Sequence, residues 1–260
     1  MFDSERLFLY NKGVFRDKNE VGVSEGCGMT TYVLIHSPLV GPMTWALVAE
    51  ELERRGVGVV TPTLTTDPHG EPPYWRQHVA QVVRAVEGVG DQPLVLVGHS
   101  GAGPLLPAVA AELDQAISTY LFVDCDLPQD GASRLDLFAS PKEAEEFRAA
   151  AVDGLLPTWR DEDLREVILD PALRREFVAE LRPLPLAVYE EPLPVPEVWP
   201  DAPCGYVQLS AAYLASGRQA RQAGWGYYRL MGGHFHMLVD PAAVADALQC
   251  LGQDLAVLAA

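Results

Sequence analysis

The stretch Val95–Gly103, with the sequence VLVGHSGAG, decides the fold of this chain. An apolar run typical of a buried strand leads into it, and a segment of helical character follows Ser100. A sharp turn from strand to helix crowds the backbone and strains the residue at the turn, so small neighbours such as Gly98 and Gly101 are needed. The pattern predicts a nucleophile elbow, which exposes the Ser100 hydroxyl and aims the first amides of the helix at a nearby anionic oxygen.

Outward from this elbow, strand-like and helix-like segments alternate. Apolar, β-rich runs occupy residues 31–35, 57–61, 93–97, 117–123, 205–209 and 226–230. Helical patterns occupy residues near 43–55, 73–87, 102–114, 212–223 and 241–251. This alternation predicts an α/β fold with a mainly parallel sheet that helices flank on both faces.

Two segments fall outside the alternation and divide the chain. Residues 1–28 are predicted to be an N-terminal extension, and residues 29–126 and 204–260 to form the core. Residues 127–203, inserted after the strand at 117–123, contain predicted helices near 141–151, 161–168 and 171–182 and then a proline-rich run. An insertion at this point would cover the strand ends at which such sheets bind ligands, so we expect a cap or lid. A purely structural insertion is the alternative.

Composition narrows the classes of partner. The net charge of −17 argues against nucleic acid and anionic membranes as partners. The partner we expect is a small-molecule substrate. The four cysteines lack the spacing of a zinc site or a disulfide framework, and we expect no metal or other cofactor. No run reaches the roughly 18 apolar residues of a membrane span, and no signal peptide is evident, so a cytoplasmic location is expected. The oligomeric state stays open, a homodimer being one alternative.

Three phrases together resemble the α/β-hydrolase superfamily over about residues 30–255, most closely its small esterase and hydroxynitrile-lyase-like branch. They are Gly98–Gly103, Phe122–Pro128 (FVDCDLP) and Gly232–Leu238 (GGHFHML). The resemblance implies an α/β-hydrolase fold in which Ser100 attacks a carbonyl group and His234 accepts its proton.

The resemblance also implies roles for residues around this pair. The Gly101 amide would help to hold the oxyanion. His99 matches a position that is common beside the site and is expected to be structural. His236 would line the pocket or pack against the last helix.

The acid of the expected triad is displaced. The family usually places an aspartate just after the strand at 205–209, where this chain has Ala211 or Ala212. Asp124 and Asp126 at the end of the strand at 117–123 are substitutes, since some members of the superfamily use an acid there. We favour Asp126, because Asp124 matches an aspartate that is common in this branch even when the acid lies elsewhere. The remaining alternative is that neither carboxylate serves.

The oxyanion hole is altered as well. In relatives the amide of the third residue of a His-Gly-x phrase is the second donor, and here that residue is Pro38, which has no N–H. The Leu39 amide or the Ser37 hydroxyl would replace it if the loop shifts. Loss of such a donor typically costs about 10²–10³ in rate. The alternatives are a rearranged loop and a site that no longer stabilises a strong oxyanion.

Three functions are consistent with these residues. The first is a serine-dependent enzyme for a small, largely apolar ester or thioester, by hydrolysis or acyl transfer. The second is a lyase, isomerase or cyclase of specialised metabolism, in which His234 is the acid or base and Ser100 positions the substrate. The third is a binding protein with an inactive site. The superfamily resemblance favours the first.

Overall fold

A computed structural model describes residues 30–259 of the chain, so the extension predicted over residues 1–28 lies outside the described residues. Its central feature is a six-stranded sheet in which all neighbouring strands are parallel. The strand order is β2 (Gly58–Val60), β1 (Thr31–Ile35), β3 (Leu94–His99), β4 (Ile117–Val123), β7 (Cys204–Gln208) and β8 (Gly226–Arg229). The predicted α/β-hydrolase architecture, a mainly parallel sheet flanked by helices, is confirmed.

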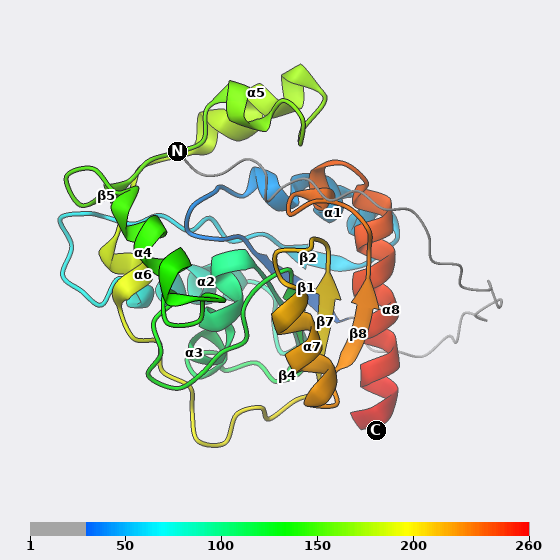
Figure 1. Ribbon diagram of the computed structural model, residues 1–260. Coiled ribbons are helices and arrows are strands. Elements are labelled where there is room, and N and C mark those ends of the chain that lie inside the picture. Colours follow the sequence, from blue (N-terminus) through cyan, green and yellow to red (C-terminus); the bar gives the residue numbers. More distant parts are fainter. Residues whose placement is uncertain (1–29, 260) are drawn as a thin grey trace.

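Helices cover both faces of the sheet (Figure 1). Helices α1 (Met43–Arg54) and α8 (Pro241–Ala259) pack on one face, and α2 (Trp75–Val86), α3 (Leu106–Ala110) and α7 (Leu214–Gln222) pack on the other. Alternate side chains along each strand serve the two faces: Leu34 and Val97 belong to the first core, Ile35 and Leu96 to the second, and all four are fully buried. Burial on both faces explains why these strands are continuous apolar runs.

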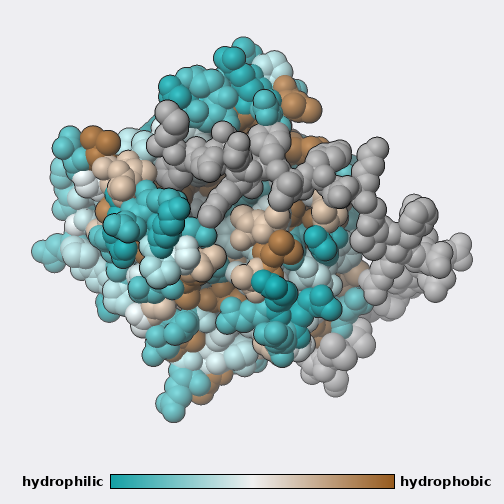
Figure 2. Space-filling model, viewed as in Figure 1, coloured by the Kyte–Doolittle hydropathy of each residue, from teal (hydrophilic) through white to brown (hydrophobic). Residues whose placement is uncertain are grey.

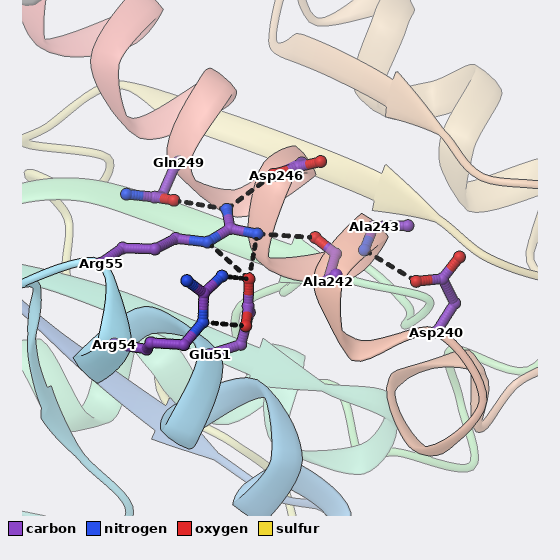
Figure 3. Close-up of polar contacts among 8 residues, drawn as sticks. All are labelled: Glu51, Arg54, Arg55, Asp240, Ala242, Ala243, Asp246 and Gln249. Carbon is purple, nitrogen blue, oxygen red and sulfur yellow. Dashed lines mark hydrogen bonds and ion pairs between the residues drawn. The ribbon is translucent and has the colours of Figure 1, made fainter.

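An ion-pair network joins the C-terminal end of α1 to α8 (Figure 3). The Arg55 guanidinium donates to Asp246 Oδ1 at 2.6 Å, to Gln249 Oε1 at 2.7 Å and to Glu51 Oε1 at 2.6 Å. Hydrogen bonds from Arg54 and Arg55 lower the pKa of Glu51 to about 2. The network bridges the two helices, but such exposed pairs contribute little to stability, and the helices are held mainly by their buried apolar side chains.

The insertion between β4 and β7 folds into short elements. These are α4 (Pro141–Ala149), the antiparallel pair β5 (Leu155–Leu156) and β6 (Leu184–Pro185), a 3-10 turn (Asp161–Leu164), α5 (Pro171–Glu180) and α6 (Ala187–Glu190). Glu180 Oε2 accepts the Met43 amide of α1 at 2.8 Å, which satisfies an N–H that a helix start leaves free. Phe177 packs against Phe235, which follows His234, with ring centroids 5.2 Å apart. The insertion therefore covers the loop that carries His234, and its action as a lid stays a prediction.

The helix expected over 102–114 is shorter and begins as a 3-10 helix. Residues Ser100–Leu105 are 3-10, and α3 follows over Leu106–Ala110. Pro104 lies inside the 3-10 segment and Pro107 in the first turn of α3. A proline has no N–H to donate and clashes with the preceding turn, so regular α-helical geometry starts only after Pro104.

Close packing at the elbow gives a first prediction, for Gly103→Ala. A Cβ at Gly103 would lie 2.3 Å from Cys125 Sγ and 2.8 Å from Cys125 Cβ, so the segment after β4 would have to move. We expect the free energy of unfolding to fall by about 1–3 kcal/mol, as measured by urea denaturation. Gly88→Ala is the control, because no atom lies within 4 Å of the added Cβ. Equal stability of the two variants would contradict tight packing here.

Candidate active site

Ser100 lies at the carboxyl end of β3, where the strand turns into the 3-10 helix. Its φ of +54° is in the left-handed region, as the predicted elbow requires. A Cβ at Gly98 would lie 3.0 Å from Gly103 Cα, so the glycines allow the chain to fold back on itself at this point. The turn leaves Ser100 half-buried at the edge of the sheet, with Gly101 at the start of the following helix.

His234 forms a hydrogen-bonded pair with Asp124. The distance from His234 Nδ1 to Asp124 Oδ2 is 2.8 Å, and the Asp124 side chain is fully buried. The same carboxylate accepts the Leu209 and Ser210 amides, each at 2.9 Å, and the Ser210 hydroxyl at 2.6 Å. These three hydrogen bonds fix the position of the buried Asp124 carboxylate. The carboxylate in turn orients the His234 imidazole and leaves Nε2 available for proton transfer.

The sequence argument favoured Asp126 as the partner of His234, but the hydrogen bond of Asp126 goes elsewhere. Asp126 Oδ1 accepts the Ser216 hydroxyl of α7 at 2.8 Å. Asp124 adopts a φ of +45° directly after β4, which turns its side chain across the sheet toward the end of β7. Its carboxylate thereby reaches the backbone after β7, the region in which the resemblance led us to expect an acid. Sequence position alone did not reveal this turn.

Tyr213, which sequence reasoning did not single out, connects the two halves of the site. Its ring stacks on the His234 ring with centroids 5.4 Å apart and an interplanar angle of 21°. Its hydroxyl lies near the Ser100 side chain, and burial raises the pKa of Tyr213 well above its usual range, so the phenol stays protonated. Tyr213 follows Ala211 and Ala212, so an aromatic residue lies beside the position at which an acid was sought.

His99 and His236 have structural surroundings. His99 is fully buried, its Nε2 donates to the His234 carbonyl at 3.0 Å, and its ring lies 4.5 Å from that of His234. Burial lowers the pKa of His99 well below its usual range, so the ring is neutral and ties the elbow to the loop after β8. His236 packs over Gly232, where an added Cβ would come within 2.3 Å of its ring. It does not belong to the lining of the cavity described below.

The loop after β1 lies beside the elbow, because Ile35 pairs with Gly98 in the sheet. Ser37 is 2% exposed, and its hydroxyl accepts the Leu39 amide at 3.4 Å. Pro38 carries no donor, and His36 accepts the Leu64 amide on Nε2 at 3.0 Å. Burial lowers the pKa of His36 to about 4, so a neutral His36 anchors this loop from behind.

A cavity of about 520 Å³ opens between the segment after β4 and the start of α7. Tyr213, whose ring stacks on that of His234, belongs to its lining, whereas Ser100 and His234 themselves do not. The lining combines apolar side chains with carboxyl groups: Leu127, Leu137, Phe138, Asp126, Asp136 and Glu143. Figure 2 shows that the face carrying α4 and α7 is mostly hydrophilic, with hydrophobic residues gathered near its centre. The cavity therefore offers an apolar surface under negative potential.

Asp126 gives a second prediction, on pH dependence. Burial raises its pKa to about 6 in the folded protein, against 3.8 ordinarily. Between these values the unfolded chain releases the proton while the folded chain keeps it, so stability falls as the pH rises. We expect the free energy of unfolding of Asp126→Asn, taken relative to that of wild type, to rise by about 1–3 kcal/mol as the pH increases from about 4 to about 7. Urea denaturation at each pH measures it. A stability difference that is constant over this range would contradict the buried-carboxyl assignment.

Residues 30–259 contain neither a metal cluster nor a membrane-spanning helix. Within them, no group of three or more His, Cys, Asp or Glu side chains is arranged to hold a metal ion. Over the same part of the chain, no helix combines the length and apolar character that crossing a membrane requires.

Comparison with known proteins shows which protein family the chain matches. The model of the alpha/beta hydrolase family matches residues 32–247. The "Carbendazim hydrolyzing esterase" of Nocardioides sp. (strain SG-4G) is 28% identical over 254 residues, which cover 86% of this chain and 100% of that relative.

Solved structures share the fold at lower identity. An extracellular alpha/beta-hydrolase from a Paenibacillus species is 22% identical with a TM-score of 0.70, over 86% of this chain and 99% of its own. Tomato methylketone synthase I, in its complex with 2-tridecanone, is 15% identical with a TM-score of 0.66, over 88% of this chain and 100% of its own. Esterases and enzymes named for other reactions thus share this architecture.

Proposed function

Because this chain belongs to the alpha/beta hydrolase family, we propose that it is a serine-dependent esterase for a small, largely apolar ester or thioester. The observation that carries the proposal is the 2.8 Å hydrogen bond between His234 Nδ1 and Asp124 Oδ2 beside the strained elbow at Ser100. It supplies the orienting carboxylate that the usual position lacks. The relative named as a carbendazim hydrolyzing esterase supports the same reaction class.

In the proposed mechanism, the Ser100 hydroxyl turns toward His234 Nε2 when a substrate binds. Ser100 Oγ attacks the carbonyl carbon while His234 Nε2 takes its proton, and Asp124 stabilises the imidazolium through Nδ1–H. The carbonyl oxygen becomes an oxyanion that accepts the Gly101 amide. Its collapse expels the alcohol or thiol, to which His234 returns the proton, and water then cleaves the acyl-enzyme by the same steps.

The alternative, a lyase, isomerase or cyclase, rested on two missing parts of the site. The pairing of Asp124 with His234 weakens the first reason, since the imidazole has an orienting acid. The absent N–H of Pro38 still favours the alternative, because a reaction without an acyl-enzyme needs less stabilisation of an oxyanion.

A test of the proposed function combines turnover with covalent labelling. We expect the wild-type protein to hydrolyse neutral p-nitrophenyl esters of short apolar acids, and to discriminate against esters that carry a carboxylate, because the cavity is acidic. A fluorophosphonate should modify Ser100, and mass spectrometry of the digested protein would locate the adduct. Absence of both turnover and labelling would refute the esterase proposal, and labelling of another serine would refute the role of Ser100.

A further inference from the structure

The oxyanion hole of this protein lacks one backbone donor. Pro38 stands where relatives of this type supply the second amide, and the nearby Leu39 amide hydrogen-bonds instead to the Ser37 hydroxyl at 3.4 Å. The Gly101 amide is then the one backbone donor assigned to the oxyanion. Removing a donor from such a site typically costs about 10²–10³ in rate, so an active esterase needs a replacement.

Tyr189, in α6 of the insertion, has its hydroxyl next to Gly101 and Ser37, beside the loop in which the second donor is missing. The phenolic oxygen lies 2.6 Å from the ideal position of a Cβ on Gly101, and Ser37 Oγ lies 3.0 Å from the same point. Only a glycine at position 101 leaves this space open. The Tyr189 side chain is 4% exposed, so its hydroxyl acts in a water-poor environment, where hydrogen bonds to an anion are strongest.

The Tyr189 hydroxyl has a donor proton to spare. Among the described residues, its hydrogen-bond partner is Ser37 Oγ at 3.5 Å, the limit of a hydrogen bond. Burial raises the pKa of Tyr189, so the phenol keeps its proton at neutral pH. A carbonyl oxygen that becomes negatively charged near Gly101 offers a better acceptor than the Ser37 hydroxyl does.

Arg134 holds Tyr189 against the elbow. This arginine is 2% exposed, and its Nε donates to the Gly101 carbonyl at 2.7 Å while Nη1 donates to the Val188 carbonyl at 2.7 Å. Its guanidinium carbon lies 5.7 Å from the centroid of the Tyr189 ring. One buried cation thus joins the backbone of the first oxyanion donor to the residue that precedes Tyr189. The hydrogen bonds of Arg134 thereby hold the insertion against the elbow.

We propose that the Tyr189 hydroxyl, positioned by Arg134 and Ser37, is the second oxyanion donor and replaces the absent amide of Pro38. When Ser100 Oγ bonds to the carbonyl carbon, the carbonyl π-electrons move to oxygen. That oxygen accepts hydrogen bonds from the Gly101 amide and the Tyr189 hydroxyl, with no proton transferred. The assignment rests on the proposed esterase function, and it makes the insertion part of the catalytic apparatus.

The test is Tyr189→Phe, which removes only the hydroxyl. We expect kcat for a p-nitrophenyl ester to fall by about 10²-fold, with KM changed by less than about threefold, because the bond forms only in the transition state. Tyr74→Phe is the matched control: Tyr74 belongs to the same apolar cluster and is 9% exposed, and its variant should keep wild-type kcat. A Tyr189→Phe variant within about threefold of wild-type kcat would overturn the assignment.

A second measurement separates a donor from a packing residue. A phenylboronic acid forms an anionic tetrahedral adduct on a reactive serine, whereas the alcohol product binds without developing charge. Tyr189→Phe should weaken boronate binding by about 10²-fold and leave binding of the alcohol nearly unchanged. Equal weakening of both would mean a packing role and overturn the assignment.

The same experiments distinguish a failure of the Tyr189 assignment from a failure of the proposed esterase function. A large loss in Ser37→Ala together with normal Tyr189→Phe would overturn the assignment in favour of Ser37. If instead the wild-type protein neither turns over esters nor binds the boronate, the proposed esterase function itself has failed, and the assignment to Tyr189 fails with it. Turnover that depends on Ser100 but is indifferent to Tyr189→Phe leaves the esterase function standing and refutes only the role of Tyr189.

Discussion

Replacing Ser100 by alanine should reduce kcat for ester hydrolysis by about 10⁴-fold or more. Without the hydroxyl no acyl-enzyme forms, and the remaining rate comes from binding and from the oxyanion donors. The substitution removes a single oxygen at a residue whose φ of +54° alanine tolerates about as poorly as serine, so little change in stability is expected. KM should stay within a few-fold of wild type.

The measurement is steady-state turnover of a p-nitrophenyl ester, with fluorophosphonate labelling as a second readout. Ser118→Ala is the matched control, because Ser118 lies on β4 and its hydroxyl donates to the Leu94 carbonyl at 3.0 Å, away from the elbow. If Ser100→Ala kept more than about one tenth of the wild-type kcat, the serine mechanism would be rejected, and acid–base chemistry at His234 alone would become the better explanation.

The second large effect is expected for Asp124→Asn, with kcat reduced by about 10⁴-fold. The Asn oxygen can still accept the Leu209 and Ser210 amides, which turns the amide nitrogen toward His234 Nδ1. Nδ1 must then accept a hydrogen bond, so the ring proton moves to Nε2. A protonated Nε2 cannot take the proton of Ser100, and catalysis is lost although the site is otherwise intact.

Asp126→Asn decides between the two carboxylates that the sequence left open. Asp126 accepts the Ser216 hydroxyl, so its replacement should change kcat by less than about tenfold. A larger loss in Asp126→Asn than in Asp124→Asn would reverse the assignment of the acid. The double variant Ser100→Ala/Asp124→Asn should be no slower than Ser100→Ala alone, since the residues of a triad act as one unit.

The architecture was predictable because its signals are local. The apolar runs over 31–35 and 117–123 coincide with β1 and β4, and glycines mark the turn at Ser100. The late and short helix after the elbow differs from the expected one, and the difference arises from Pro104, a residue whose effect is itself local.

The sequence by itself determined the α/β fold, the elbow and the histidine phrase, because strand periodicity, turn chemistry and a short motif depend on neighbouring residues. Only the tertiary structure decided that Asp124 rather than Asp126 meets His234, that Tyr213 contacts both halves of the site, and that Tyr189 faces Gly101. These contacts join residues that lie far apart in the chain, 110 positions in the case of Asp124 and His234. Their geometry follows from the register of the parallel strands and from the backbone turn at Asp124, whose φ is +45°. Neither feature can be predicted from the order of residues along the chain.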